Sequence, residues 1–197
     1  MATERQMQPI SVAEYFKLEE NTSGTRYEYV DGYVYMMAGG SFNHDAIKAN
    51  IQGLIWNLLR KQSRCNIYIF DIKMQVTERR YYYPDVVITC DSRDQGTGDL
   101  LKYPRTIFEV LSPSTETMDR RRKMRDYLAL PTLEEYFLVD SRVCRVEMYR
   151  REAGKWVYYL FGLEDELELA SIDLHLSMGE VYEKVHFDPA DAEDEGE

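Results

Sequence analysis

Long apolar runs are absent from this 197-residue sequence, and none approaches the roughly 20 residues that cross a bilayer. The N-terminal stretch 1–6 is polar and has no apolar centre, so no signal peptide is visible. Both absences predict a cytoplasmic protein with no membrane partner. The chain is 44% hydrophobic and 30% charged, which is typical of globular proteins. Its length predicts a single domain over residues 1–187.

Cysteine is scarce. The three cysteines, Cys65, Cys90 and Cys144, are odd in number and widely separated. They have neither the spacing of a metal knuckle nor that of a disulfide framework. The favoured interpretation is therefore three small buried thiols in a reducing cytosol, rather than catalytic cysteines.

Basic residues are also in deficit, because 24 Lys and Arg face 35 Asp and Glu and leave a net charge of -11. This balance counts against an extended basic surface for nucleic acid. Part of the negative charge is local, since residues 188–197 hold six acidic residues and no basic one. We expect this tail to be disordered and solvating.

The apolar pattern predicts strands with a few helices between them. A capping box at Ser11 begins one helix, helical spacing marks a second over 47–59, and a third is predicted over 116–129. The polar stretch 91–103 is expected to be a mobile loop. Strands are predicted at 26–30 and 33–37 around Asp31-Gly32, and at 81–89, 106–111, 135–140, 145–150, 155–161 and 166–169. The fold class is therefore α/β (α+β mixed), a mixed sheet with helices packed on it.

Two of the predicted strands each carry one carboxylate. Asp85 opens the apolar run 86–88, and Glu109 interrupts the run 107–111. A buried unpaired charge is costly, and a hard divalent cation is the usual partner that makes two converging acids tolerable. The carbonyl of Val110 would add an oxygen ligand. The alternative is ordinary structure, with a Pro-Asp turn and a glutamate paired with an arginine.

Lys123 lies on the helix predicted to follow the second acid. Phosphodiester cleavage needs a metal, a water nucleophile and a cation near the developing charge, which two acids and this lysine would supply. Asp119 is four residues earlier, so it shares a helix face with Lys123 and would orient it. Neighbouring arginines would contact phosphates. The alternative is a solvated charged face, which is favoured for Arg121 and Arg122.

Glu28 and His44 form a further candidate pair. Glu28 lies inside a predicted strand, which is unusual for an acid, and would extend the metal site through a water or hold Lys123. His44 lies at a helix start, where a capping or surface histidine is the favoured alternative to a ligand. The aromatic run 81–83 would offer stacking faces to bases, although strand packing is the commoner use.

Several motifs in this order resemble a known family. They are Arg26-Tyr-Glu-Tyr-Val-Asp-Gly, Met37-Ala-Gly-Gly-Ser-Phe-Asn-His, Tyr83-Pro-Asp-Val, Glu109-Val-Leu-Ser-Pro-Ser-Thr, Asp119 with Lys123 and Tyr127, and Glu135-Tyr-Phe-Leu-Val-Asp. Together they resemble the Uma2 family, a bacterial group of restriction-endonuclease-like proteins within the PD-(D/E)XK nuclease superfamily. The resemblance covers about residues 10–185.

The resemblance implies a restriction-endonuclease-like core, with a mixed central β-sheet flanked by helices. It also implies dependence on Mg²⁺ (with Mn²⁺ as a substitute), DNA as the substrate, and a homodimer. Asp85 and Glu109 match the metal-binding acids, and Glu28 matches an acidic residue near the N-terminal core.

One position departs from the superfamily pattern. A lysine usually follows the second acid by two residues, and here that position is Leu111. The lysine would instead come from the next helix, at Lys123. The resulting prediction is a Mg²⁺-dependent endonuclease acting on DNA. The alternatives are a catalytically silent DNA-binding or protein-interaction module and a hydrolase of another phosphoester.

Overall fold

The computed structural model describes residues 8–22, 24–37, 39–62, 64–69, 72–96 and 98–188. The predicted acidic tail, apart from its first residue, lies outside them. The helices are α1 (Val12–Asn21), α2 (Phe42–Gln62), η1 (Ser92–Asp94), η2 (Met118–Lys123), α3 (Met124–Leu128), η3 (Ala170–Ile172) and α4 (Met178–Val181). None of these described helices is long and apolar enough to cross a membrane.

The larger sheet has six strands in the order β11-β10-β9-β8-β6-β3. Their bounds are β3 (Asn66–Ile69), β6 (Val86–Thr89), β8 (Thr106–Leu111), β9 (Glu135–Asp140), β10 (Val146–Glu152) and β11 (Lys155–Phe161). Only β8 and β9 pair in parallel, and the other neighbours are antiparallel. The central strands β8 and β9 are buried throughout, as strands covered on both faces should be.

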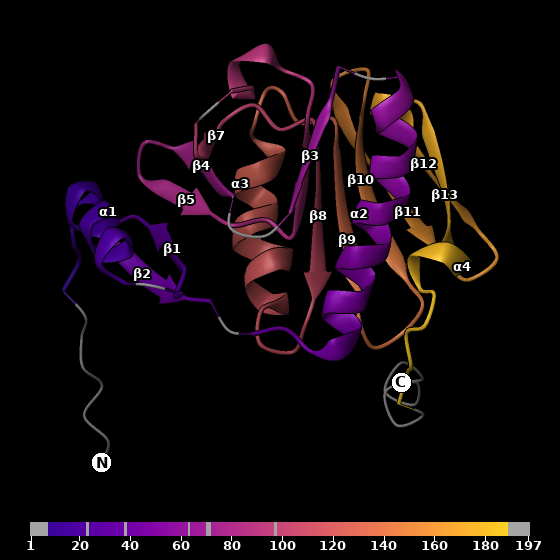
Figure 1. Ribbon diagram of the computed structural model, residues 1–197, viewed down its shortest axis with the longest axis horizontal. Helices are drawn as coiled ribbons and strands as arrows, with labels where there is room; N and C mark the ends of the chain where they lie inside the picture. The colour runs from indigo at the N-terminus through magenta and orange to yellow at the C-terminus, as the bar shows by residue number, and fades with distance from the viewer. Residues whose placement is uncertain are drawn as a thin grey trace.

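Helices cover both faces of this sheet, with α3 and α2 to either side of β8 (Figure 1). The apolar stripe of α2, including Ile47, Ile51 and Ile55, packs on one face with Phe108 and its neighbours. On the opposite face, Tyr127 of α3 packs with alternate residues of the same strands. The predicted mixed central sheet flanked by helices is therefore confirmed. Because successive side chains of a strand point to opposite faces, Glu109, which follows Phe108, points to the face that α3 covers.

A second sheet of five strands has the order β2-β1-β5-β4-β7. Its strands are β1 (Tyr27–Val30), β2 (Tyr33–Met36), β4 (Lys73–Thr77), β5 (Arg80–Tyr82) and β7 (Leu100–Leu101), and β12 (Glu166–Leu169) and β13 (Leu174–Ser177) form a separate pair. The predicted hairpin at Asp31-Gly32 is confirmed: both residues have positive φ, 51° and 106°, as a type I′ turn requires.

Two predicted boundaries were wrong. The single strand 81–89 is two strands in different sheets, β5 and β6, because Pro84 interrupts the run. This break leaves Asp85 just outside β6. The expected loop 91–103 contains the 3₁₀ turn η1 and the short strand β7. The helix predicted over 116–129 is present, but its centre η2 is a π-helix.

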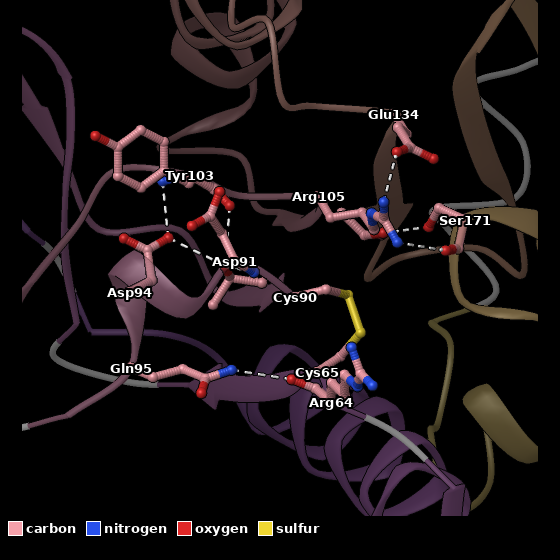
Figure 2. Close-up of a disulfide and its surroundings, with 12 residues drawn as sticks. Arg64, Cys65, Cys90, Asp91, Asp94, Gln95, Tyr103, Arg105, Glu134 and Ser171 are labelled. Atoms are coloured by element: carbon pink, nitrogen blue, oxygen red, sulfur yellow. Dashed lines mark hydrogen bonds and ion pairs between the residues drawn. A yellow bond between two sulfur atoms is a disulfide. The ribbon is translucent and has the colours of Figure 1, made fainter.

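Two cysteines form a disulfide, which corrects the prediction of three reduced thiols. Cys65 precedes β3 and Cys90 follows β6, at the position next to the paired residues Asn66 and Thr89 (Figure 2). Their sequence separation of 25 residues concealed this contact, because only the strand register brings them together. Cys144 remains a free cysteine. The small number of cysteines therefore does not indicate a reducing compartment.

Candidate active site

Asp85 lies at the beginning of β6, facing the first turns of α2. Its Oδ2 atom accepts a hydrogen bond from the backbone N–H of Val110 at 2.8 Å and lies 3.3 Å from Nε2 of His44. Its Oδ1 atom is 3.6 Å from the ammonium of Lys48. Burial acts to raise the pKa of Asp85, but these partners outweigh it and hold the pKa below its usual value. Asp85 is therefore ionised at neutral pH.

Glu109 is the acid in the middle of β8 and is 2% exposed. Its Oε1 atom accepts a hydrogen bond from the hydroxyl of Tyr127 at 2.9 Å and lies 3.3 Å from Nζ of Lys123. Burial raises the pKa of Glu109 well above its usual range, and the carboxylates of Asp119 and Asp85 raise it further, while Lys123 opposes them. The two acids thus have pKa values pushed in opposite directions, a pattern that marks functional pairs of carboxyls.

Lys123 is the last residue of the π-helix η2 and is 5% exposed. Its ammonium lies 2.9 Å from Glu28, 3.1 Å from Asp119 and 3.3 Å from Glu109. Burial lowers the pKa of Lys123, but these three acids outweigh burial and raise it. The lysine is therefore charged. Short π-helical segments frequently occur at functional sites, and here the segment ends at the lysine that contacts the acids.

Glu28 comes from β1, in the second sheet. It is 6% exposed and accepts a long hydrogen bond from the backbone N–H of Tyr83 at 3.4 Å. Burial raises its pKa and Lys123 opposes the shift. Of the two sequence hypotheses for Glu28, the contact with Lys123 is the one that the structure contains. This contact ties the hairpin β1–β2 to the end of η2.

His44 lies in the first turn of α2 and connects two acids. Its Nε2 atom is near Asp85, and its Nδ1 atom lies 3.4 Å from Oδ1 of Asp45. Burial acts to lower the pKa of His44, but Asp85 and Asp45 together raise it. The histidine does make a helix-start contact, because its backbone N–H donates to the hydroxyl of Ser41 at 3.2 Å. Its ring, however, points to Asp85 rather than to the surface.

These side chains surround one cavity of about 250 Å³. Asp85 comes from the start of β6, Glu109 from β8, Lys123 and Asp119 from η2, Glu28 from β1 and His44 from α2, so six positions of the predicted site line the same cavity. The other lining residues are Tyr35, Met36, Met37, Gly40, Lys48, Tyr83, Ser114, Thr115 and Met118. Sequence reasoning thus identified residues that the fold brings together from distant parts of the chain.

The tyrosine run 81–83 is packed, as the commoner alternative predicted. The ring of Tyr81 packs edge-on against Tyr29 and at a tilt against Tyr15, and the hydroxyl of Tyr82 donates to Asp126 at 2.7 Å. Tyr83 is 5% exposed although it lines the cavity, and its hydroxyl donates to Glu19. The run therefore forms no exposed stacking face for bases.

The family model described as "Putative restriction endonuclease", Uma2, matches residues 12–179, which is most of the chain. This chain belongs to the Uma2 family. Two uncharacterized proteins of Synechocystis sp. are similar to it. One is 37% identical over 180 residues, covering 90% of this chain and 94% of that protein. The other is 29% identical over 166 residues, covering 82% and 93%.

The fold is similar to that of a crystal structure described as a putative nuclease belonging to DUF820 from Anabaena variabilis. The two structures superpose with a TM-score of 0.74 at 18% identity, over 88% of this chain and 98% of that one. At this identity the comparison supports the fold alone. This Uma2 chain thus shares its mixed α/β architecture with that structure.

The oxygen-rich site of this Uma2 protein suits a hard cation without forming a closed cage. Within the described part of the chain, no three His, Cys, Asp or Glu side chains gather closely enough to hold a metal ion. Mg²⁺ usually binds through one or two carboxylates together with waters and substrate phosphates, so Asp85 and Glu109 meet its needs. Oδ1 of Asp119 is also buried without a hydrogen-bond partner, although it lies 3.1 Å from Lys123.

Two residues of the Uma2 site escaped sequence reasoning. Lys48 lines the cavity from α2 and lies 3.1 Å from Asp45. In the sequence it cannot be distinguished from the other polar residues of an amphipathic helix. Tyr127 donates to Glu109 although it was noted only as part of a motif. A signal for Lys48 did exist, because it lies four residues after His44 and therefore shares its helix face.

Proposed function

We propose that this protein is a Mg²⁺-dependent endonuclease that hydrolyses DNA phosphodiester bonds, with Mn²⁺ as a substitute metal. The observation that carries the proposal is the convergence of Asp85, Glu109 and Lys123 in one cavity. Membership of a family described as restriction endonucleases supports the same reaction class. The superfamily's usual lysine position holds Leu111, whose side chain is buried in the core, so Lys123 takes the role of the cation.

Asp85 and Glu109 would hold the metal, and the carbonyl of Val110 would be a further oxygen ligand. When bound, the metal would polarise the phosphate and make a water acidic enough to attack at neutral pH. Asp85 is held ionised by its neighbours, so it is ready to bind a cation. Burial raises the pKa of Glu109, so a metal bound there would compete with a proton for this carboxyl.

Lys123 would position the attacking water and stabilise negative charge on the phosphate. An ammonium already held in place by buried carboxylates is effective in this role, because it needs no reorganisation as charge develops. Glu28 and Asp119 act as positioning residues, since both hold Nζ of Lys123 within 3.1 Å. Water would add to phosphorus as the P–O bond to the leaving strand breaks, with no covalent enzyme intermediate.

Cleavage of supercoiled plasmid tests the proposal. The wild type should nick or linearise DNA with Mg²⁺ or Mn²⁺ and not with EDTA. Asp85→Asn should lower the rate by on the order of 100-fold or more, because it weakens metal binding, and Lys123→Met should do the same, because it removes the cation at the phosphate. Glu164→Gln, which changes an exposed acid outside the cavity, should cleave like the wild type. Equal cleavage by wild type and Asp85→Asn would reject the proposal.

One observation favours a second candidate, a catalytically silent module for binding DNA or protein. The ammonium of Lys123 already forms an ion pair with each of Glu28, Glu109 and Asp119, so each of these acids has a cationic partner without a metal. Calorimetric titration with Mg²⁺ and Mn²⁺ separates the candidates, because the endonuclease requires binding that Asp85→Asn weakens. A panel of other phosphoesters, assayed with the same preparation, tests for a different hydrolytic substrate.

A further inference from the structure

The rim of the cavity carries apolar side chains that are open to solvent. Met36 is 69% exposed and Met37 is 38% exposed, and both line the cavity. Beside them, the hydroxyl of Tyr35 accepts a hydrogen bond from Nη1 of Arg122 at 3.0 Å, which fixes the ring at the cavity wall. One wall is therefore apolar and partly aromatic, although the floor is charged.

The charged groups lie at the bottom of this cavity rather than on an open surface. Glu109 and Lys123 are almost inaccessible, so a phosphate can reach them only by entering. The volume of about 250 Å³ lies just below the range of about 300–1,000 Å³ that is usual for small-molecule sites. A cavity of this size suits a small group that enters it and not a duplex. A regular duplex keeps its phosphates on the outside of a wide, stiff rod and its bases inside.

The charge distribution also argues against a regular duplex. Tight duplex binding commonly uses about 6–10 phosphate contacts from Lys and Arg. Here the net charge is -11, and the basic residues of the cavity, Lys48 and Lys123, are both in ion pairs with acids. The cavity therefore has few cations for a run of phosphates but does have an apolar wall, and this combination fits a nucleotide whose base is unpaired better than a duplex.

We propose that the cavity takes an unpaired nucleotide, so that the substrate is single-stranded DNA or an unpaired stretch within a duplex. This inference rests on the proposed function and specifies its substrate. The base would lie against Met36, Met37 and the ring of Tyr35, since thioether groups and aromatic rings make favourable contacts with flat π-systems. The adjoining phosphate would then reach the side of the cavity where Lys123 and Glu109 lie.

Binding measured without cleavage tests the inference. Fluorescence anisotropy with Ca²⁺ in place of Mg²⁺ would compare one labelled sequence as a single strand, as a full duplex and as a duplex with an unpaired internal stretch. The single strand and the interrupted duplex should bind at least about tenfold more tightly than the full duplex. Truncating the rim with Met36→Ala and Met37→Ala should weaken single-strand binding by about tenfold, in the range of one stacking contact.

The matched control is the pair Trp56→Ala and Leu58→Ala. It also removes two exposed apolar side chains, but from α2 several turns beyond the cavity. It should leave single-strand binding unchanged. Full-duplex binding as tight as single-strand binding would overturn the inference, as would no binding at all or equal losses in the two double variants. Cleavage of intact duplex with equal affinities would reject the inference and keep the endonuclease. Selective binding of the single strand without any cleavage would keep the inference and reject the endonuclease.

Discussion

The backbone N–H of Val110 donates a hydrogen bond to Oδ2 of Asp85 at 2.8 Å. Because Val110 directly follows Glu109, this bond fixes one acid beside the other through the main chain. The same bond gives the N–H of Val110 an acceptor just beyond the last registered pair of β6 and β8, which is Val86 with Phe108. The relative position of the two acids therefore depends on the backbone and less on side-chain rotamers.

Replacing Lys123 with methionine should destabilise the protein by about 3–5 kcal/mol, because it leaves three buried acids without their cation. Urea unfolding would measure the loss. Mg²⁺ should restore part of it, since a ligand that binds only the folded state stabilises it. Arg121→Met, which changes an exposed cation on the same helical segment, should alter stability by less than about 0.5 kcal/mol. Equal midpoints for the two variants would contradict the ion-pair account.

Tyr127→Phe tests the same cluster with a smaller change. Its hydroxyl donates to Oε1 of Glu109, and both residues are buried. Removing the donor should lower the free energy of unfolding by about 1–3 kcal/mol, because the buried acceptor loses a partner. Tyr33→Phe, at an exposed tyrosine of β2, is the control and should be nearly neutral. If the two variants unfold at the same urea concentration, the bond has no energetic weight.

The elements that were predictable from sequence are those whose signals are local. The turn at Asp31-Gly32 requires positive φ at neighbouring positions, and the stripe 47–59 repeats with the helix period. Strand β8 was found because its apolar run ends at a serine and a proline, Ser112-Pro113. Such features depend on a few consecutive residues, so no tertiary information is needed.

What escaped prediction depends on contacts between distant segments. Pro84 marks the break between β5 and β6 in the sequence, but the sheet that each half joins depends on distant strands. The π-helix at η2 and the placement of Lys48 opposite Asp85 likewise arise from packing. The candidate acids were found only because a charge within an apolar run is costly and so needs a reason.

Breaking the disulfide should reduce stability by about 3–4 kcal/mol. The bridge closes a segment of 25 residues, and releasing it increases the conformational freedom of the unfolded chain. A hydrogen bond lies beside the bridge, because Nε2 of Gln95 donates to the carbonyl of Arg64 at 3.0 Å (Figure 2). Calorimetry of the wild type with and without a thiol-free reductant, and of the double variant Cys65→Ser plus Cys90→Ser, measures the effect. Cys144→Ser should retain the reductant response, and a wild type indifferent to reductant would refute the prediction.

Asp140 should make stability depend on acid pH. Burial raises its pKa, but the hydrogen bonds and charge of Arg142, helped by Arg145, outweigh burial and hold the pKa below the usual 3.8. A carboxylate with a lowered folded-state pKa stabilises the fold above its unfolded pKa and loses this contribution as pH falls through the folded value. Asp140→Asn should therefore cost about 1.5–3 kcal/mol at neutral pH, and this difference from the wild type should shrink as urea unfolding is repeated at pH values below about 4. Asp99→Asn, at an exposed aspartate, should show a small difference at every pH. If the difference in free energy of unfolding between the wild type and Asp140→Asn stays constant at acid pH, Asp140 stabilises the fold through its packing and not through its charge.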